Sequence, residues 1–200
     1  MGALSYKFPF LICVLLCSLT VNAQDGDHQN EIDSPREIRR ERNIQNMGDV
    51  GQFIPMAASA ALILIHNDSE GGWQYLKGFS ANIGATYILK YAINKDRPDG
   101  ATDGHAFPSG HTSFAFQGAS FIHLRYGWEY GIPAYALASF VAYSRVEGLN
   151  DRHDVFDVLG GALIGIGSSY LFTTEYQREH FQLSFSSTNQ EYLVGFIYKF

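Results

Sequence analysis

Five long apolar segments, separated by stretches rich in turn-forming residues, constrain the fold of this chain more than any other feature. Each segment is longer than an ordinary β-strand, and the stretches between them are rich in Gly, Pro, Asn and Asp, which end helices. Short connections between helices favour antiparallel neighbours. We therefore predict an all-α fold, an antiparallel bundle of about five helices. The segments cover residues 50–66, 72–94, 110–124, 132–146 and 155–176.

The last part of the chain, residues 178–200, alternates instead between apolar and polar side chains. Phe181, Leu183 and Phe185 recur at every second position, and a second alternating run follows the polar stretch "STNQ". A period of two with an intervening turn predicts a short C-terminal β-hairpin. Two strands cannot close a barrel, so we interpret the hairpin as packed on the helices or as an oligomer contact. The alternative is an outer-membrane scaffold protein, because the segment resembles the last strand of such barrels.

Residues 1–23 have the features of an export signal: a lysine precedes an apolar run that ends in small residues. The run is shorter than a spanning helix, and a retained anchor is the alternative. Both cysteines, Cys13 and Cys17, fall inside it, so the mature chain has no thiol for a disulfide, metal site or nucleophile. We predict an exported, periplasmic protein in which residues 24–49 form a polar N-terminal arm or short surface helix with solvated charges.

The net charge and the lengths of the apolar runs limit which classes of partner the protein can have. A net charge of -6 argues against nucleic acid, because nucleic-acid-binding domains are basic. The uncharged runs are shorter than the roughly 20 residues that cross a bilayer. The turns "NDSEGG" and "RYGWEYG" show no excess of Lys or Arg. We expect association with a membrane surface, and leave open both the spanning of the membrane and the oligomeric state.

Polar residues gather where four of the predicted helices begin or end. Antiparallel packing brings the end of 72–94, the start of 110–124, the end of 132–146 and the start of 155–176 to the same end of the bundle. We therefore predict one site from eight residues of these helix ends. They are Lys90, Arg97, Ser109, Gly110, His111, Arg145, His153 and Asp157.

The cations of this set indicate an anion. Lys90, Arg97 and Arg145 are costly to place on apolar elements unless an anion lies among them. Arg offers paired donors that match phosphate oxygens, and Lys adds a point charge. The backbone N–H groups of Ser109 and Gly110 lie at a helix N-terminus, which also binds anions. We therefore predict a phosphate-binding site.

The two histidines supply a possible reaction. His153 and Asp157 are four residues apart and share one helix face. Asp157 can accept a hydrogen bond from one ring nitrogen and leave the other nucleophilic, and Asp154 is the alternative orienting group. His111 is then placed to protonate a leaving oxygen.

Three motifs follow one another across residues 72–176, about half of the chain: "KYAINKDRP", "PSGH" and "SRVEGLNDRHDVFD". In this order they resemble the signature of the type 2 phosphatidic acid phosphatase / vanadium haloperoxidase superfamily. The spacer between Arg145 and His153 has seven residues where the family usually has five, which leaves the placement of these two residues open. The resemblance implies a helical domain of this type over residues 50–177.

The resemblance also implies roles for the site residues. His153 attacks phosphorus and forms a phosphohistidine, Asp157 orients and polarises His153, and His111 acts as acid toward the leaving alkoxide and then as base for water. Electrostatic stabilisation and positioning carry such a reaction without a metal or other cofactor, and vanadate is expected as an inhibitor. The implied phosphate-binding residues are Lys90, Arg97, Ser109, Gly110 and Arg145.

The predicted function is hydrolysis of phosphate monoesters or diphosphates. Because apolar helix surfaces lie beside the site, the substrate is expected to be a lipid: phosphatidate, phosphatidylglycerophosphate, a polyprenyl diphosphate or the phosphate of lipid A. A soluble acid phosphatase of broad specificity for small phosphoesters is the first alternative. A vanadium-dependent haloperoxidase, with vanadate as cofactor, is the second.

Overall fold

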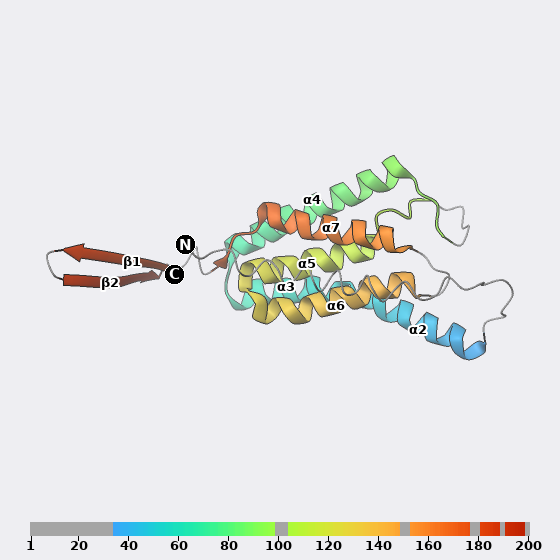
Figure 1. The fold of residues 1–200 in the computed structure, drawn as a ribbon, viewed down its shortest axis with the longest axis horizontal. Coiled ribbons are helices and arrows are strands. Elements are labelled where there is room, and N and C mark those ends of the chain that lie inside the picture. Colours follow the sequence, from blue (N-terminus) through green and yellow to red (C-terminus); the bar gives the residue numbers. More distant parts are fainter. Residues whose placement is uncertain (1–33, 99–103, 149–152, 177–180, 189–190, 199–200) are drawn as a thin grey trace. The chain divides into compact units, whose positions relative to one another are not determined.

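The computed structural model describes residues 34–98, 104–148, 153–176, 181–188 and 191–198. Within these ranges it contains six helices (Figure 1). They are α2 (Pro35–Gly51), α3 (Phe53–Ile65), α4 (Ser69–Ile93), α5 (Gly110–Tyr126), α6 (Trp128–Val146) and α7 (Val155–Phe172). Helices α3 to α7 correspond to the five apolar segments, so the helical part of the predicted fold is confirmed.

Three predictions concern the ends of the chain and one loop. The predicted signal peptide, residues 1–23, lies outside the described residues, and so do residues 149–152 of the long spacer after Arg145. The C-terminal part contains β1 (Phe181–Thr188) and β2 (Glu191–Tyr198), paired antiparallel. The existence of the hairpin as a packed element, or as an oligomer contact, stays a prediction.

Helix α2 covers much of the segment expected to be a polar arm or short surface helix. It packs against α6, and its glycines Gly48 and Gly51 are buried. Gln52 alone separates it from α3. The last turn of α2 is therefore part of the bundle. The sequence had predicted only a polar arm or surface helix with solvated charges.

Helix α5 is the central element, because it packs against α3, α4, α6 and α7 (Figure 1). Most of its residues between Thr112 and Ile122 are buried. Gly118 permits a close approach to α3, since a Cβ there would lie 2.8 Å from the backbone carbonyl carbon of Pro55. Small residues at such contacts allow two helix backbones to approach each other.

Helix α7 meets α5 closely at two of its glycines. A Cβ on Gly161 would collide with the carbonyl oxygen of Ser109, and one on Gly165 with that of Ser113. The Ser109 amide donates a hydrogen bond of 2.8 Å to the carbonyl oxygen of Asp157. The starts of α5 and α7 are therefore held together, and two parts of the predicted site come into contact.

The interior of the bundle holds polar side chains beside apolar ones, and its exterior exposes large apolar side chains. Ser59, Asn82 and Gln117 are completely buried, whereas Leu64 is 79% exposed and Leu171 is 78% exposed. In water-soluble proteins, large aliphatic side chains are among those most often buried. The exposed side chains of these helices therefore suit apolar surroundings, and small or polar side chains form the helix contacts.

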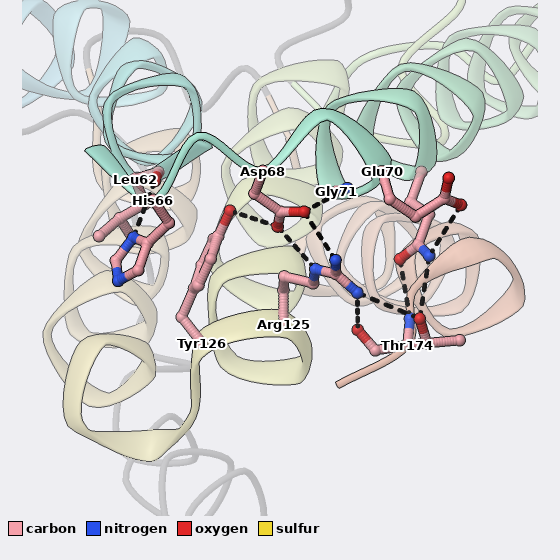
Figure 2. Close-up of polar contacts among 9 residues, drawn as sticks. Leu62, His66, Asp68, Glu70, Gly71, Arg125, Tyr126 and Thr174 are labelled. Atoms are coloured by element: carbon pink, nitrogen blue, oxygen red, sulfur yellow. Dashed lines mark hydrogen bonds and ion pairs between the residues drawn. The ribbon is translucent and has the colours of Figure 1, made fainter. Parts of the chain in front are cut away.

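A buried polar network lies where α4 begins and α5 ends, which is the end of the bundle opposite the predicted site. Figure 2 shows its contacts. Arg125, near the end of α5, donates two hydrogen bonds of 2.7 Å to the carboxylate of Asp68, before α4. Tyr126 donates to the same carboxylate, and Arg125 also donates to the carbonyl oxygen of Thr174, after α7. The network joins the α3–α4 turn, α5 and the segment after α7. The sequence suggested only turns in this region.

Candidate active site

A cavity of about 240 Å³ lies at the end of the bundle where α4 and α6 end and α5 begins. Thr86, Tyr87 and Phe114 supply part of its wall, and Gln52 contributes from the α2–α3 junction. Six of the eight predicted site residues line it. They are Lys90, Arg97, Gly110, His111, Arg145 and His153.

Lys90 reaches the cavity from the last turn of α4. Asn94 ends this helix with a left-handed φ of 46°, and the chain then turns back toward the site. The Lys90 Nζ donates a hydrogen bond of 2.7 Å to the carbonyl oxygen of His105, and the Ala106 amide donates to the carbonyl oxygen of Lys95. These bonds join the two sides of the α4–α5 connection, from which Arg97 lines the cavity.

Ser109 and Asp157 are the two predicted site residues that lie behind the cavity wall. Ser109 is completely buried, its amide binds the Asp157 carbonyl, and its hydroxyl accepts from Thr112. The prediction that the Ser109 amide faces the phosphate therefore differs from the structure, because packing of α7 on α5 engages that amide. Gly110 lines the cavity at the start of α5 instead.

His153 is backed by a buried carboxylate. Its Nδ1 lies 3.4 Å from Oδ2 of Asp157, which has no exposed side-chain surface. Asp154 caps α7: its carboxylate accepts from the Asp157 amide, and its own amide donates to Asp157 Oδ2. Of the two candidate orienting groups, Asp157 is therefore the one whose carboxylate faces His153.

Lys95 is a residue of this arrangement that the sequence analysis missed. Its Nζ lies 2.5 Å from Asp154 Oδ2 and 2.7 Å from Asp157 Oδ1. Burial acts against its charged form, but the hydrogen bonds and charges of both carboxylates prevail and raise the pKa of Lys95. The sequence held one signal of this contact: Lys95 lies inside the first motif, and Asp154 and Asp157 lie inside the third.

The protonation state of His153 suits a nucleophile. Burial lowers the pKa of His153 below its ordinary value, and Lys90 and Arg97 add to this effect, although Asp157 opposes it. The imidazole is therefore neutral near pH 7. With Nδ1 facing Asp157, the remaining ring nitrogen, Nε2, is the atom available for attack.

Arg145 and His111 share a second carboxylate, from α2. Arg145 is only 3% exposed and donates from Nη1 to Oδ1 of Asp49 over 2.7 Å. His111 Nε2 lies 3.1 Å from the same oxygen. Burial and Arg145 lower the pKa of His111 to about 4, while Asp49 acts in the opposite direction. Sequence analysis missed Asp49, because a single carboxylate at the end of a polar arm carries no signal of a contact 96 positions away.

Comparison with known proteins assigns the class. The model of the PAP2 superfamily matches residues 71–181, which is more than half of the chain. The chain belongs to the PAP2 superfamily, and the family predicted from the three motifs is confirmed.

Two curated relatives are lipid A phosphatases. The chain is 32% identical to the lipid A 4'-phosphatase of Helicobacter pylori (strain J99 / ATCC 700824) over 171 residues, which are 78% of this chain and 85% of the relative. It is 46% identical to the lipid A 1-phosphatase of Porphyromonas gingivalis over 81 residues, which are 38% of this chain. This second match spans 17% of the relative's length.

Two solved structures share the fold. Aquifex aeolicus LpxE superposes with a TM-score of 0.55 at 20% identity, over 79% of this chain and 92% of that one. The transmembrane PAP2 type phosphatidylglycerolphosphate phosphatase of Bacillus subtilis gives a TM-score of 0.53 at 22% identity, over 82% and 91%. At these identities the two structures support the architecture alone.

Proposed function

We propose that this chain is a lipid phosphatase that hydrolyses a phosphate ester through a phosphohistidine on His153. The observation that carries the proposal is the shared cavity: Lys90, Arg97 and Arg145 line it together with His111 and His153. Three cations around one small space match the charge of a phosphate group, and the neutral ring of His153 supplies a nucleophile.

The proposed reaction has two steps. His153 Nε2 attacks phosphorus, the P–O bond to the leaving group breaks, and His111 gives its proton to the departing alkoxide. Water then attacks the phosphohistidine while His111 takes a proton from it, and phosphate leaves with the His153 ring restored. The negative charge of the substrate raises the pKa of His111 from its value in the empty cavity. Substrate binding therefore favours the protonated form of His111, which is the form that a general acid needs.

The cations of the chain supply the charge stabilisation in this proposal. Lys90, Arg97 and Arg145 neutralise the phosphoryl oxygens in the transition state, and Gly110 adds the N-terminus of α5. We propose no metal or other cofactor for either step. Vanadate, which mimics the five-coordinate phosphorus, is expected to inhibit.

A lipid substrate is supported by the surface of the bundle and by the relatives. Two described helical segments, Pro35–Ile65 and Val155–Phe172, are long and apolar enough to cross a membrane. Exposed side chains such as Phe156 and Leu163 extend the apolar surface along α7. Because two relatives are named lipid A phosphatases, we propose the phosphate of lipid A as the first substrate to test. A membrane-embedded bundle on an exported chain would present the cavity to such a lipid.

Phosphate release by the purified full-length protein tests the proposal. Lipid A, phosphatidate, phosphatidylglycerophosphate, a polyprenyl diphosphate and p-nitrophenyl phosphate would be offered in mixed micelles. We expect release from a lipid, none with His153→Ala, and normal release with His66→Ala, a matched histidine at the opposite end of the bundle. Alkaline quenching with 32P-labelled substrate, which preserves the acid-labile P–N bond, would trap label on the wild type and not on His153→Ala. Equal activity of His153→Ala would contradict the mechanism, and hydrolysis of p-nitrophenyl phosphate alone would contradict the lipid specificity.

A further inference from the structure

We propose that Asp49 of α2 is a positioning residue of this active site, which holds Arg145 and His111 in their working orientation. The inference rests on the proposed phosphatase function. Asp49 precedes the residues matched by the family model, 71–181, so the three motifs that define the site do not include it. Its carboxylate links a cavity-lining cation with the proposed general acid.

The contacts of Arg145 show that α2 is built against it. Nη1 donates to Asp49 Oδ1 over 2.7 Å, Nη2 donates to the carbonyl oxygen of Gln45 over 2.9 Å, and Nε donates to the hydroxyl of Ser144 over 3.3 Å. The guanidinium is thus held from three directions, and two of the three contacts come from α2. A buried Arg held in this way presents a fixed donor geometry to a phosphate.

The last turn of α2 packs closely against Ser144 and Arg145 at Gly48. A Cβ on Gly48, the residue before Asp49, would collide with the hydroxyl of Ser144 and lie 2.9 Å from Arg145 Nη2. Gln52, one turn later, lines the cavity and donates to the carbonyl oxygen of Asp49. The last turn of α2 is therefore a wall of the site, and Asp49 has a defined place in it.

The charges around His111 explain why a carboxylate is needed there. Arg145 from α6 and His153 from the segment before α7 both disfavour its protonated form, as does burial. Lys90 from α4 and Arg97 from the α4–α5 connection line the same cavity. Among the described residues, Asp49 is the carboxylate in contact with His111. A general acid must carry a proton when the substrate arrives, and Asp49 stabilises that form while its hydrogen bond fixes the ring.

The experiment compares Asp49→Asn and Asp49→Glu with Glu129→Gln, an exposed carboxylate in the first turn of α6. In the full-length protein in detergent micelles, labelled with 15N-histidine, NMR titration gives the pKa of the His111 ring. Asp49→Asn should lower the pKa of His111 by about one pH unit, the size of effect that a nearby opposite charge produces.

Steady-state kinetics is the second measurement. With a lipid phosphate as substrate, Asp49→Asn should lower kcat about tenfold, part of what a general acid contributes, with KM little changed. The basic limb of the pH profile should move to lower pH. Asp49→Glu should keep the wild-type limb, and Glu129→Gln should change nothing.

Two results would overturn the inference. One is an unchanged His111 pKa and an unchanged pH profile in Asp49→Asn. The other is a lower KM with undiminished kcat, because Asp49 would then occupy the place of a substrate oxygen and compete with it. If the wild type releases no phosphate from any substrate, the proposed function fails, and the NMR titration still decides whether Asp49 sets the protonation of His111.

Discussion

The imidazole of His153 faces the carboxylate of Asp157, with 3.4 Å between Nδ1 and Oδ2. The two residues are four positions apart, at the start of α7, and the carboxylate has no exposed surface. Its other oxygen accepts from Lys95. Orientation of a nucleophilic ring by a buried carboxylate, itself held by a cation, is the relationship on which the proposed chemistry depends.

Asp157→Asn should lower kcat about 10³- to 10⁴-fold, since an amide cannot hold the required tautomer of a catalytic histidine as a carboxylate does. Asp154→Asn is the matched control, because Asp154 caps α7 without facing His153. It should cost about 1 kcal/mol of stability or less and keep most of the activity. Steady-state kinetics on the preferred lipid phosphate, beside thermal unfolding, would separate the two effects. A larger fall in kcat in Asp154→Asn than in Asp157→Asn would show that Asp154, and not Asp157, orients His153.

Lys95→Met should move the acidic limb of the pH profile to higher pH. The loss of this ammonium leaves the carboxylates of Asp154 and Asp157 without their shared cation, and a less compensated Asp157 raises the pKa of His153. His153 must be neutral to attack, so activity will then be lost at a higher pH on acidification. Lys77→Met, an exposed lysine on α4, is the control. An unchanged acidic limb in Lys95→Met would show that Lys95 has no influence on the nucleophile.

The helices and the position of the site could be predicted from the sequence because both follow from local patterns. Apolar runs of helical length defined α3 to α7. The antiparallel rule then placed Lys90, His111, Arg145 and His153 at one end of the bundle, and the structure brings them to one cavity. Their catalytic roles stay predictions, supported by the family and by this geometry.

The partners of these residues could not be predicted, because they depend on which surfaces pack. Asp49 meets Arg145 across 96 positions and Lys95 meets Asp157 across 62. The Ser109 amide is engaged by a carbonyl of α7 only because glycines let the two helices approach. No periodicity or spacing in a single sequence specifies such contacts.

The stability of the protein should fall as the pH is lowered from 7 toward 4. The folded-state pKa of His153 is lowered, and that of His111 is lowered to about 4, whereas an unfolded histidine has a pKa near 6.5. Below about pH 6.5 the unfolded chain therefore binds more protons than the folded chain, and the loss of stability accumulates until the pH falls below the folded-state pKa values. Thermal unfolding in micelles from pH 7.5 to 4 would measure the slope.

A double variant, His111→Gln with His153→Gln, is the control for this pH dependence. Its unfolding temperature should decline less steeply over the same range, since neither position can then take up a proton. Added vanadate or phosphate should raise the unfolding temperature of the wild type and not of the double variant. Parallel slopes for the two proteins would assign the acid sensitivity to other groups.

Arg125→Met should destabilise the bundle without slowing the chemistry. It leaves the carboxylate of Asp68 buried without its cation, at the end of the bundle away from the cavity (Figure 2), and breaking a buried ion pair costs about 3–5 kcal/mol. The double variant Asp68→Asn with Arg125→Met removes the uncompensated charge and keeps a side chain able to cap α4. The double variant should therefore lose less stability than the two single variants, Asp68→Asn and Arg125→Met, lose together. Unfolding temperatures would give these losses, and kcat measured well below them should equal that of the wild type. A fall in kcat with unchanged unfolding temperature would instead place Arg125 in communication with the active site.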